Sequence, residues 1–376
     1  MLDLLTELAP LLAAGEQVAV ATVVRTFQSA PRPAGAAMAV LGSGEAVGSV
    51  SGGCVEGAVY EAGLAALADG PAVLQRYGVS DDDAFAVGLT CGGIIDIFVE
   101  ALSADAFPAL GEVTASVRAG DPVAVATVLT PGPHVGAHLA VWPDRVGGSL
   151  GLARLDDAVT ADARGFLAAG RTGVLHYGEH GERRGDAVEV FVEAHVPPAR
   201  MLVFGAIDFA SALARLGKFL GYHVTVCDAR AVFATPRRFP DADEVVVDWP
   251  HRFLDTVSVD ARTAVCVLTH DPKFDVPLLE KALATPAGYI GVMGSRRTHA
   301  ERLALLAERG VAAADLARLA SPIGLDIGAR TPEETAVSIA AELIALRWGG
   351  TGRRLSDTEG PIHADDPAVA VAPGTP

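Results

Sequence analysis

Residues 18–22 read VAVAT, and the same five letters return at residues 123–127. The residues that follow match as well, because Gly-Ala leads to Ala-Val at residues 35–40 and again at residues 136–141. Tyr-Gly and Phe-Val-Glu-Ala also occur in both stretches. The spacing of roughly 100 residues is far longer than the period of a solenoid. The sequence therefore predicts two similar α+β halves.

One stretch of the first half has no counterpart in the second. GSV at residues 48–50 returns as GSL at residues 148–150, but the SGGCVE that follows, residues 51–56, is replaced by GLARLD at residues 151–156. TCGG, residues 90–93, has no counterpart either. Features that both copies keep are explained by packing. We therefore predict that the residues found only in the first copy carry function.

Composition and charge exclude several classes of protein. The formal net charge of −17 opposes binding to nucleic-acid phosphates. No apolar run approaches the roughly 20 residues of a membrane helix, and the start of the chain lacks the basic region of a secretory signal. Cys54, Cys91, Cys227 and Cys266 form neither a disulfide framework nor a CxxC zinc pattern. We expect a cytoplasmic protein with reduced thiols, no metal site of its own, no nucleic-acid partner and no membrane span.

The pattern changes after Pro197 and Pro198. Short apolar runs then alternate with helical patterns, which is the βαβ rhythm of an open parallel sheet. Residues 331–334 (TPEE) carry a threonine cap, a first-position proline and a glutamate that completes a capping box, so they predict a helix that ends near Trp348. The predicted fold class is α/β, a duplicated α+β N-terminal region followed by a Rossmann-like parallel-sheet domain. The predicted parts are a first half at residues 1–103, a degenerate second copy at residues 104–196, a Rossmann-like domain at residues 197–349 and a disordered tail at residues 350–376.

The first candidate site is the run that only the first half contains. Two glycines between a strand and a helix let the backbone approach a ligand, and the helix N-terminus would present free N–H groups to an anion. Cys54 is predicted in the first helical turn, where a thiolate is favoured that can act as nucleophile, carry a sulfane sulfur or ligate a soft metal. The alternative is a tight turn with a small buried cysteine and Glu56 as a favourable first-turn acid. We favour function, with Cys54 as candidate thiolate or sulfur-handling group. The candidate residues are Ser51, Gly52, Gly53, Cys54 and Glu56.

The second candidate site is Cys91-Gly92-Gly93, just before an expected strand. A thiol beside two glycines fits a second close approach of the backbone to a ligand, as the other wall of one pocket. A strand-entry turn with an incidental cysteine explains the same residues. Both interpretations stay open.

The third candidate site lies where a dinucleotide-binding loop would stand, at residues 205–210 (GAIDFA). Gly205 is the first glycine of that motif, and Asp228 ends the next strand, where a carboxylate would bind ribose hydroxyls. However, Ile207 would obstruct a pyrophosphate, and Asp208 places negative charge beside it. We expect a Rossmann-like scaffold, interpret Asp208 as a helix cap, and regard NAD(P) binding in the usual geometry as disfavoured.

The fourth candidate site is the strand-to-helix turn Gly294-Ser295-Arg296-Arg297. Its backbone N–H groups, a hydroxyl and two guanidiniums would suit a phosphate. The alternative is a pair of surface arginines on a helix. His270, beside Asp271, is expected nearby at a strand end, where it could bind the ligand or form a structural hydrogen bond.

Taken together, four segments resemble the XdhC/CoxI family, which are accessory proteins for molybdenum hydroxylases such as xanthine dehydrogenase and carbon monoxide dehydrogenase. They are GSVSGGCVEG at residues 48–57, TCGG, YIGVMGSRRT at residues 289–298, and SPIGLDIGARTPEETAVSIAAELIA at residues 321–345. The resemblance covers nearly the whole chain except the tail. At residues 205–209, GAIDF departs from the family, in which a second glycine and a histidine are usual.

The resemblance implies a chaperone that binds the molybdenum cofactor, supports addition of its terminal sulfur and delivers it to a client hydroxylase. The cofactor would be carried rather than used, so a maturation factor is favoured over an enzyme. It also implies a cysteine desulfurase as a further partner and a homodimer. We expect Cys54 and residues 294–297 to face one opening, within a chain or across a dimer interface. The alternative function is an NAD(P)-binding oxidoreductase that uses the Rossmann-like domain; a scaffolding protein would leave Cys54 unexplained.

Overall fold

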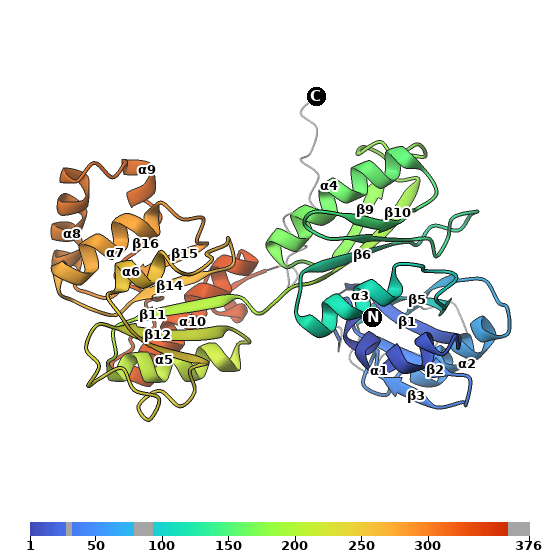
Figure 1. Ribbon diagram of the computed structural model, residues 1–376, viewed down its shortest axis with the longest axis horizontal. Helices are drawn as coiled ribbons and strands as arrows, with labels where there is room; N and C mark the ends of the chain where they lie inside the picture. Colours follow the sequence, from blue (N-terminus) through green and yellow to red (C-terminus); the bar gives the residue numbers. More distant parts are fainter. Residues whose placement is uncertain (28–31, 79–92, 360–376) are drawn as a thin grey trace. The chain divides into compact units, whose positions relative to one another are not determined.

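The computed structural model describes residues 1–27, 32–78 and 93–359. The chain forms two compact units, of which the first ends at Pro197 and the second begins at Pro198. In Figure 1 the first unit runs from blue to green and the second from yellow-green to red. Within the described ranges, no helix combines the length and the apolar character that crossing a membrane requires.

The first unit contains two antiparallel five-stranded sheets with equivalent strand orders, β3-β2-β1-β5-β4 and β8-β7-β6-β10-β9. Residues 18–22 lie in β1 and residues 123–127 in β6, so VAVAT forms part of the central strand of each sheet. The elements of the first half are α1 (Leu2–Ala13), β1 (Val18–Phe27), β2 (Ala37–Leu41), β3 (Ala46–Gly48), α2 (Glu56–Leu67), β4 (Val73–Tyr77) and β5 (Ile94–Leu102). Those of the second are α3 (Leu110–Ala119), β6 (Val123–Val128), β7 (His138–Val141), β8 (Val146–Gly148), α4 (Ala153–Ala169), β9 (Gly173–Tyr177) and β10 (Val188–His195).

The central strand β1 is buried along most of its length because both faces of its sheet are covered. Val18 and Val20 pack into a core that also contains Val125 of the second half. Ala19 packs into a separate core with Val59 of α2. Successive side chains of a strand point to opposite faces, so an uninterrupted apolar run is what a strand covered on both sides requires.

The second unit is built on a parallel six-stranded sheet in the order β13-β12-β11-β14-β15-β16. Helices α5 and α10 supply the core on one face, and α6, α7 and α8 supply it on the other (Figure 1). The strand order reverses between β11 and β14, and open α/β sheets bind ligands beyond the carboxyl ends of the strands at such a point. The predicted α/β class, with a duplicated region followed by a Rossmann-like domain, is confirmed.

The elements of the second unit follow in chain order, and η1 falls within the predicted tail, of which residues 360–376 lie outside the described residues. They are β11 (Arg200–Phe204), α5 (Asp208–Phe219), β12 (His223–Asp228), β13 (Glu244–Val247), α6 (Pro250–Leu254), β14 (Ala264–Val267), α7 (Pro272–Leu283), β15 (Tyr289–Val292), α8 (Arg296–Glu308), α9 (Ala313–Leu316), β16 (Leu319–Ala320), α10 (Pro332–Trp348) and η1 (Leu355–Asp357).

Helix α10 begins and ends where its local signals predict. The hydroxyl of Thr331 accepts the N–H of Glu334, and the carboxylate of Glu334 accepts the N–H of Thr331. Pro332 is the first helical residue, and Gly349 ends the helix in the left-handed conformation. Both ends depend on neighbouring residues only, which is why sequence patterns suffice here.

Candidate functional site

The glycine-cysteine motif forms an irregular loop between β3 and α2. Helix α2 begins at Glu56, with Val55 as its N-cap, so the prediction that Cys54 lies in the first helical turn is wrong. Gly52 and Gly53 have φ values of +77° and +119°, which a helix does not accept. The cysteine therefore precedes the helix, and the helix dipole acts on it less directly than expected.

The carboxylate of Glu56 folds back and holds this loop together. It accepts hydrogen bonds from the hydroxyl of Ser49 at 2.8 Å, the N–H of Gly53 at 2.8 Å, and both the N–H and the hydroxyl of Ser51. Burial works to raise the pKa of Glu56, but the hydrogen bonds from Ser51 and Ser49 outweigh it and lower the pKa to about 2. Glu56 is thus ionised at neutral pH and acts as the clamp of the loop.

Three further N–H groups of the loop are also engaged within it. The hydroxyl of Ser51 accepts from the N–H groups of Cys54 and Val55, each at 3.0 Å, and Ser49 accepts from the N–H of Gly52 at 3.0 Å. The N–H groups of residues 51–55 are therefore not available to an anion, and the prediction of free N–H groups is left to the start of α2 itself, at Glu56 and Gly57. What the loop presents outward is the exposed backbone of its two glycines beside Cys54.

Cys54 differs from the other described cysteines in its exposure. It is half-buried and packs against the apolar cluster of the first half. Cys227 and Cys266 are buried in β12 and β14, as predicted, and burial raises the pKa of both thiols to about 12. A thiol with such a pKa stays protonated at neutral pH, so Cys54 is the reachable thiol among these three.

The second candidate site, at residues 91–93, lies only partly within the described residues. Cys91 and Gly92 lie outside the described residues. Gly93 is buried and directly precedes β5, the strand that pairs with β1 and β4. The structure thus places Gly93 at the entry of a central sheet strand, which is the position that the sequence predicts.

A cavity of about 370 Å³ borders the loop on the side of Ser49. Thr172, Glu193 and His195 of the second half line it as well. Glu193 Oε1 accepts the N–H of Leu2 at 2.9 Å, whereas its Oε2 is buried without a partner among the described residues. Ligand pockets commonly have volumes of about 300–1,000 Å³. Sequence reasoning missed this cavity, although the repeated Phe-Val-Glu-Ala contained its glutamate.

In the second unit, Gly205 and Asp228 are used by the fold itself. A Cβ at Gly205 would lie 2.9 Å from the methyl group of Thr269, so glycine allows the ends of β11 and β14 to approach each other. Asp228 is buried and accepts from the N–H of Ala206 and from the backbone and guanidinium of Arg230. Burial works to raise the pKa of Asp228, but these bonds hold it below its usual value. A ribose would have to displace Arg230, which disfavours NAD(P) further.

Two further acids have structural roles. The role of Asp208 differs from the predicted one, and the role of Asp271 bears on the interpretation of His270 that the sequence left open. Asp208 is the first residue of α5 rather than its cap, which is Ile207; its carboxylate pairs with Arg238 at 3.3 Å. Asp271 caps α7 by accepting the N–H of Lys273. His270 is exposed beside it, so Asp271 serves the helix and His270 is left pointing to solvent as a candidate ligand contact.

The predicted phosphate turn caps α8. Ser295 is the N-cap, and its hydroxyl accepts the N–H of Thr298 at 3.1 Å. Arg297 is exposed and pairs with Glu301 of the same helix. Among the described residues, the N–H groups of Arg296 and Arg297 donate to no acceptor. The start of α8 therefore has donors to offer.

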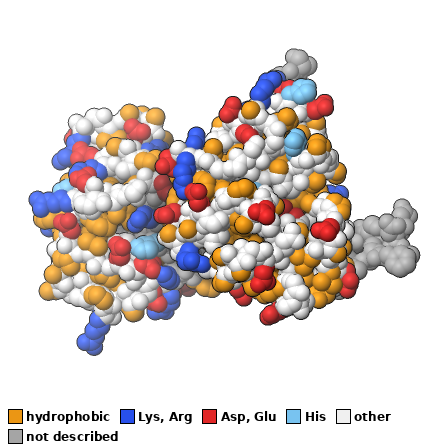
Figure 2. All heavy atoms as spheres, turned by 45° about the vertical axis from the view of Figure 1, so that its right-hand side comes forward, with side chains coloured by type: hydrophobic (Ala, Val, Ile, Leu, Met, Phe, Trp, Pro, Cys, Tyr) orange, Lys and Arg blue, Asp and Glu red, His pale blue; other side chains and the backbone are white. Residues whose placement is uncertain are grey.

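Charges of both signs are mixed on the face that Figure 2 shows. On the face shown in Figure 2, Lys and Arg side chains alternate with Asp and Glu and do not form one continuous basic patch. Within the described residues, no cluster of three or more His, Cys, Asp and Glu side chains could hold a metal ion. Among the described residues, the thiol loop and the α8 turn therefore remain the stronger candidate ligand sites.

Comparisons with known proteins agree with this division of the chain. A family model described as the XdhC Rossmann domain matches residues 201–343. A second model, described as the XdhC and CoxI family, matches residues 11–78 and 116–178, and so covers part of each half of the first unit.

Several similar proteins extend over nearly the whole chain. A protein of Bacillus subtilis (strain 168), named as a probable xanthine dehydrogenase subunit, is 28% identical over 349 residues, which are 91% of this chain and 97% of that protein. The molybdenum cofactor insertion chaperone PaoD of Escherichia coli (strain K12) is 27% identical over 337 residues, 89% of this chain and 85% of that protein. A crystal structure of a xanthine dehydrogenase from Bacillus halodurans aligns with a TM-score of 0.64 and 26% identity over 95% of this chain and 97% of that one.

Proposed function

This chain belongs to the XdhC and CoxI family, and we propose that it carries the molybdenum cofactor to a molybdenum hydroxylase of the xanthine dehydrogenase type. The names of its relatives support this role, since one is a cofactor insertion chaperone and another is named for xanthine dehydrogenase. In this proposal the protein works in the cytoplasm as a homodimer, and the cofactor is cargo that it binds and releases without turnover.

The observation that carries the proposal is the loop at residues 49–56. Its clamp fixes the backbone, and its glycines leave that backbone exposed beside a half-buried thiol. A thiolate is a soft ligand that suits a metal bound by sulfur. The cavity of about 370 Å³ that Ser49 lines, at the start of the same loop, offers room for a ring system.

The finer part of the proposal concerns sulfur. Cys54 would take up a sulfane sulfur as a persulfide, by exchange with the persulfide of a cysteine desulfurase, whose thiol is regenerated. Attack of a second thiolate on the inner sulfur would form a disulfide and release the outer sulfur as sulfide, the oxidation level of the cofactor's terminal sulfur. Cys91 stands as a second thiol for the same step. The phosphate end of the cargo would bind at Gly294, Ser295, Arg296 and Arg297, with His270 as a further contact. A single ligand would then need both sites, within one chain or across the dimer.

The test is anaerobic purification followed by analysis of molybdenum and pterin, together with activation of the client hydroxylase. Cys54→Ser keeps the size and hydrogen-bonding capacity of the side chain but removes thiolate chemistry. We expect the variant to fold and to activate the client about tenfold less or worse, given the 10–100-fold losses usual around metal sites. Cys91→Ser is measured beside it.

The matched control is Cys266→Ala, which removes a buried thiol of the second unit and should leave activation unchanged. Full activation of the client by Cys54→Ser would show that the thiol is not the working group. Absence of molybdenum and pterin from the wild-type protein, under conditions in which the client matures, would remove the carrier role itself.

A further inference from the structure

A buried arginine lies beneath the turn at the start of α8. Arg302 is only 4% exposed and belongs to the second turn of the helix. Its Nη2 donates to Asp275 Oδ2 at 3.0 Å and to the carbonyl of Met293 at 3.3 Å. Its Nη1 is buried and has no hydrogen-bond partner among the described residues. The sequence pattern did not single out this residue.

Neighbouring residues hold the guanidinium so that it cannot turn to satisfy that donor. Asp275, on α7, is 2% exposed, and its other oxygen accepts the hydroxyl of Thr269 at the end of β14. A planar guanidinium fixed by one arm leaves the other arm pointing in a set direction. An unpaired donor on a buried charged group costs free energy, which an acceptor from a ligand would recover.

The unpaired arm lies against the glycine of the predicted phosphate turn. A Cβ added at Gly294 would stand 3.6 Å from Arg302 Nη1, and Gly294 has a φ of +152°. The same Cβ would stand 3.6 Å from the Cβ of Thr298 and 3.7 Å from Arg302 Nη2, so glycine leaves space between the guanidinium and the first turn of α8. The unpaired N–H groups of Arg296 and Arg297 begin the helix directly after it. Donors from the helix start and from Arg302 thus meet at one turn.

We propose that this turn binds a phosphoryl group, with Arg302 as a buried binding residue and Asp275 as its positioning residue. Phosphate oxygens accept from N–H groups at helix starts and from guanidiniums, and the helix dipole favours their charge. The turn follows β15, which lies beside β14 at the carboxyl edge of the sheet, where open α/β sheets bind ligands. Thr269 links the arginine to Gly205 at the reversal of strand order.

This inference rests on the proposed function for the identity of the cargo, because it deepens its phosphate end. The phosphoryl group could be the terminal phosphate of a cofactor without a nucleotide or the pyrophosphate of a dinucleotide form. The test needs neither cofactor. The full-length protein is titrated by calorimetry with inorganic phosphate and, separately, with pyrophosphate in chloride buffer.

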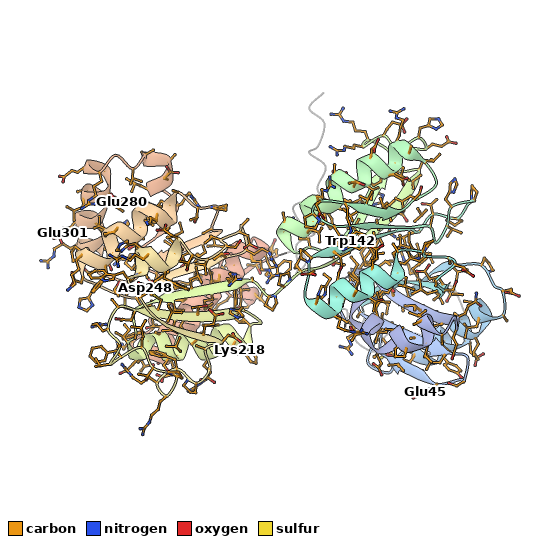
Figure 3. The ribbon with its side chains drawn as sticks, in the orientation of Figure 1. Glu45, Trp142, Lys218, Asp248, Glu280 and Glu301 are labelled. Atoms are coloured by element: carbon orange, nitrogen blue, oxygen red, sulfur yellow. The ribbon has the colours of Figure 1, made fainter. Side chains whose placement is uncertain are left out.

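Two variants probe the site in different ways. Arg302→Lys keeps a cation for Asp275 but removes the second arm, and Gly294→Ala keeps the ion pair but places a methyl group over Nη1. We expect each to weaken binding about tenfold or more, as loss of one hydrogen bond to a charged group does. The control is Arg309→Lys, at the other end of α8, where Arg309 pairs with Glu280; Figure 3 labels Glu280 on α7 and Glu301 on α8.

Binding of inorganic phosphate would support a terminal phosphate as ligand, and binding of pyrophosphate alone would support the dinucleotide form. Wild-type protein that binds neither anion saturably would overturn the proposal. Folded Arg302→Lys with wild-type affinity would do the same, and if that variant unfolds, Gly294→Ala decides. Wild-type protein that co-purifies with molybdenum but binds neither anion would refute this inference and spare the carrier function.

Discussion

The two halves of the first unit form the same turn in different ways, at residues 49–56 and residues 149–156. Both use a serine and an acid, because Ser49 donates to Glu56 and Ser149 donates to Asp156. In the second half, however, α4 begins at Ala153, three positions before its acid, whereas α2 begins at the acid itself. The serine–carboxylate clamp is thus common structure. What the first half adds is an unwound segment that carries Gly52, Gly53 and Cys54.

The unwound segment has no packing explanation of its own. A Cβ at Gly52 or Gly53 would meet no atom within 4 Å. In the second half, by contrast, a Cβ at Gly151 would lie 2.2 Å from Nδ1 of the exposed His134, and Gly151 also has a φ of +93°, so a side-chain contact and the backbone conformation both favour glycine there. The glycines of the first half are required by backbone conformation only. Irregular backbone that brings no gain in packing is typical of binding sites, and this supports the role proposed for the segment.

The largest effect, on client activation, is expected when the loop of the first half is given the residues of the second. The variant Gly52→Leu, Gly53→Ala, Cys54→Arg introduces the residues found at 152–154. We expect α2 to gain a turn, the protein to stay folded, and client activation to fall about a hundredfold or to background, because both the thiol and the exposed backbone are lost. Circular dichroism and client activity measure the two outcomes.

The reciprocal variant is the control for this exchange. Leu152→Gly, Ala153→Gly, Arg154→Cys should keep client activation and lose roughly 1–2 kcal/mol of stability, since glycine weakens a helix start. If the first variant still activates the client, the common clamp is sufficient and the added segment is not the working part.

A smaller effect, on the free energy of unfolding, is expected when the serine–carboxylate clamp is weakened. The loss should be larger in the first half than in the second. Glu56→Gln weakens bonds from Ser49, Ser51 and Gly53 and should cost about 2 kcal/mol in the free energy of unfolding. Asp156→Asn weakens bonds from Ser149 and the N–H of Leu150 and should cost about 1 kcal/mol. Urea unfolding of both variants at pH 7 measures the difference, and equal costs would contradict the unequal clamps.

The Glu56 contribution should also depend on pH in a defined window. Its pKa falls from an ordinary 4.5 to about 2 in the folded protein. A lowered pKa stabilises the fold fully above the unfolded value and loses that effect as pH falls towards the folded value. The stability gap between wild type and Glu56→Gln should therefore be constant above about pH 5 and close between pH 4.5 and 2. A gap that widens on acidification would show that Glu56 is not ionised in the fold.

Sequence patterns predicted most of the fold because its signals are local. The capping residues of α10 and the apolar runs of β13 and β15 lie next to the structures they determine. The errors fall where the partner is distant or the backbone unusual. Asp208 pairs with Arg238 rather than capping α5, and the positive φ of two glycines delays the start of α2.

The proposed binding residues were predictable to the same extent. The Gly-Gly-Cys loop was found because a second copy lacked it, which is a comparison that sequence allows. Arg302 was not, because its burial and its unpaired donor depend on Asp275, which lies on another helix. Glu193 was visible as a repeated residue, but only the packing of the two halves places it beside the cavity.

The smallest effect is expected from a single methyl group at Gly52. Because φ is +77° and no atom lies within 4 Å, Gly52→Ala should cost only the conformational penalty, about 1 kcal/mol. Gly52→Asn should cost less than alanine, since asparagine adopts the left-handed region more readily. Thermal unfolding of the two variants measures this order. Unchanged stability in Gly52→Ala would contradict a conformational role for this glycine. If client activation fell in the same variant, the lack of a side chain at residue 52 would be needed to admit the ligand. The added segment would then act by direct contact with the ligand and not through its backbone conformation.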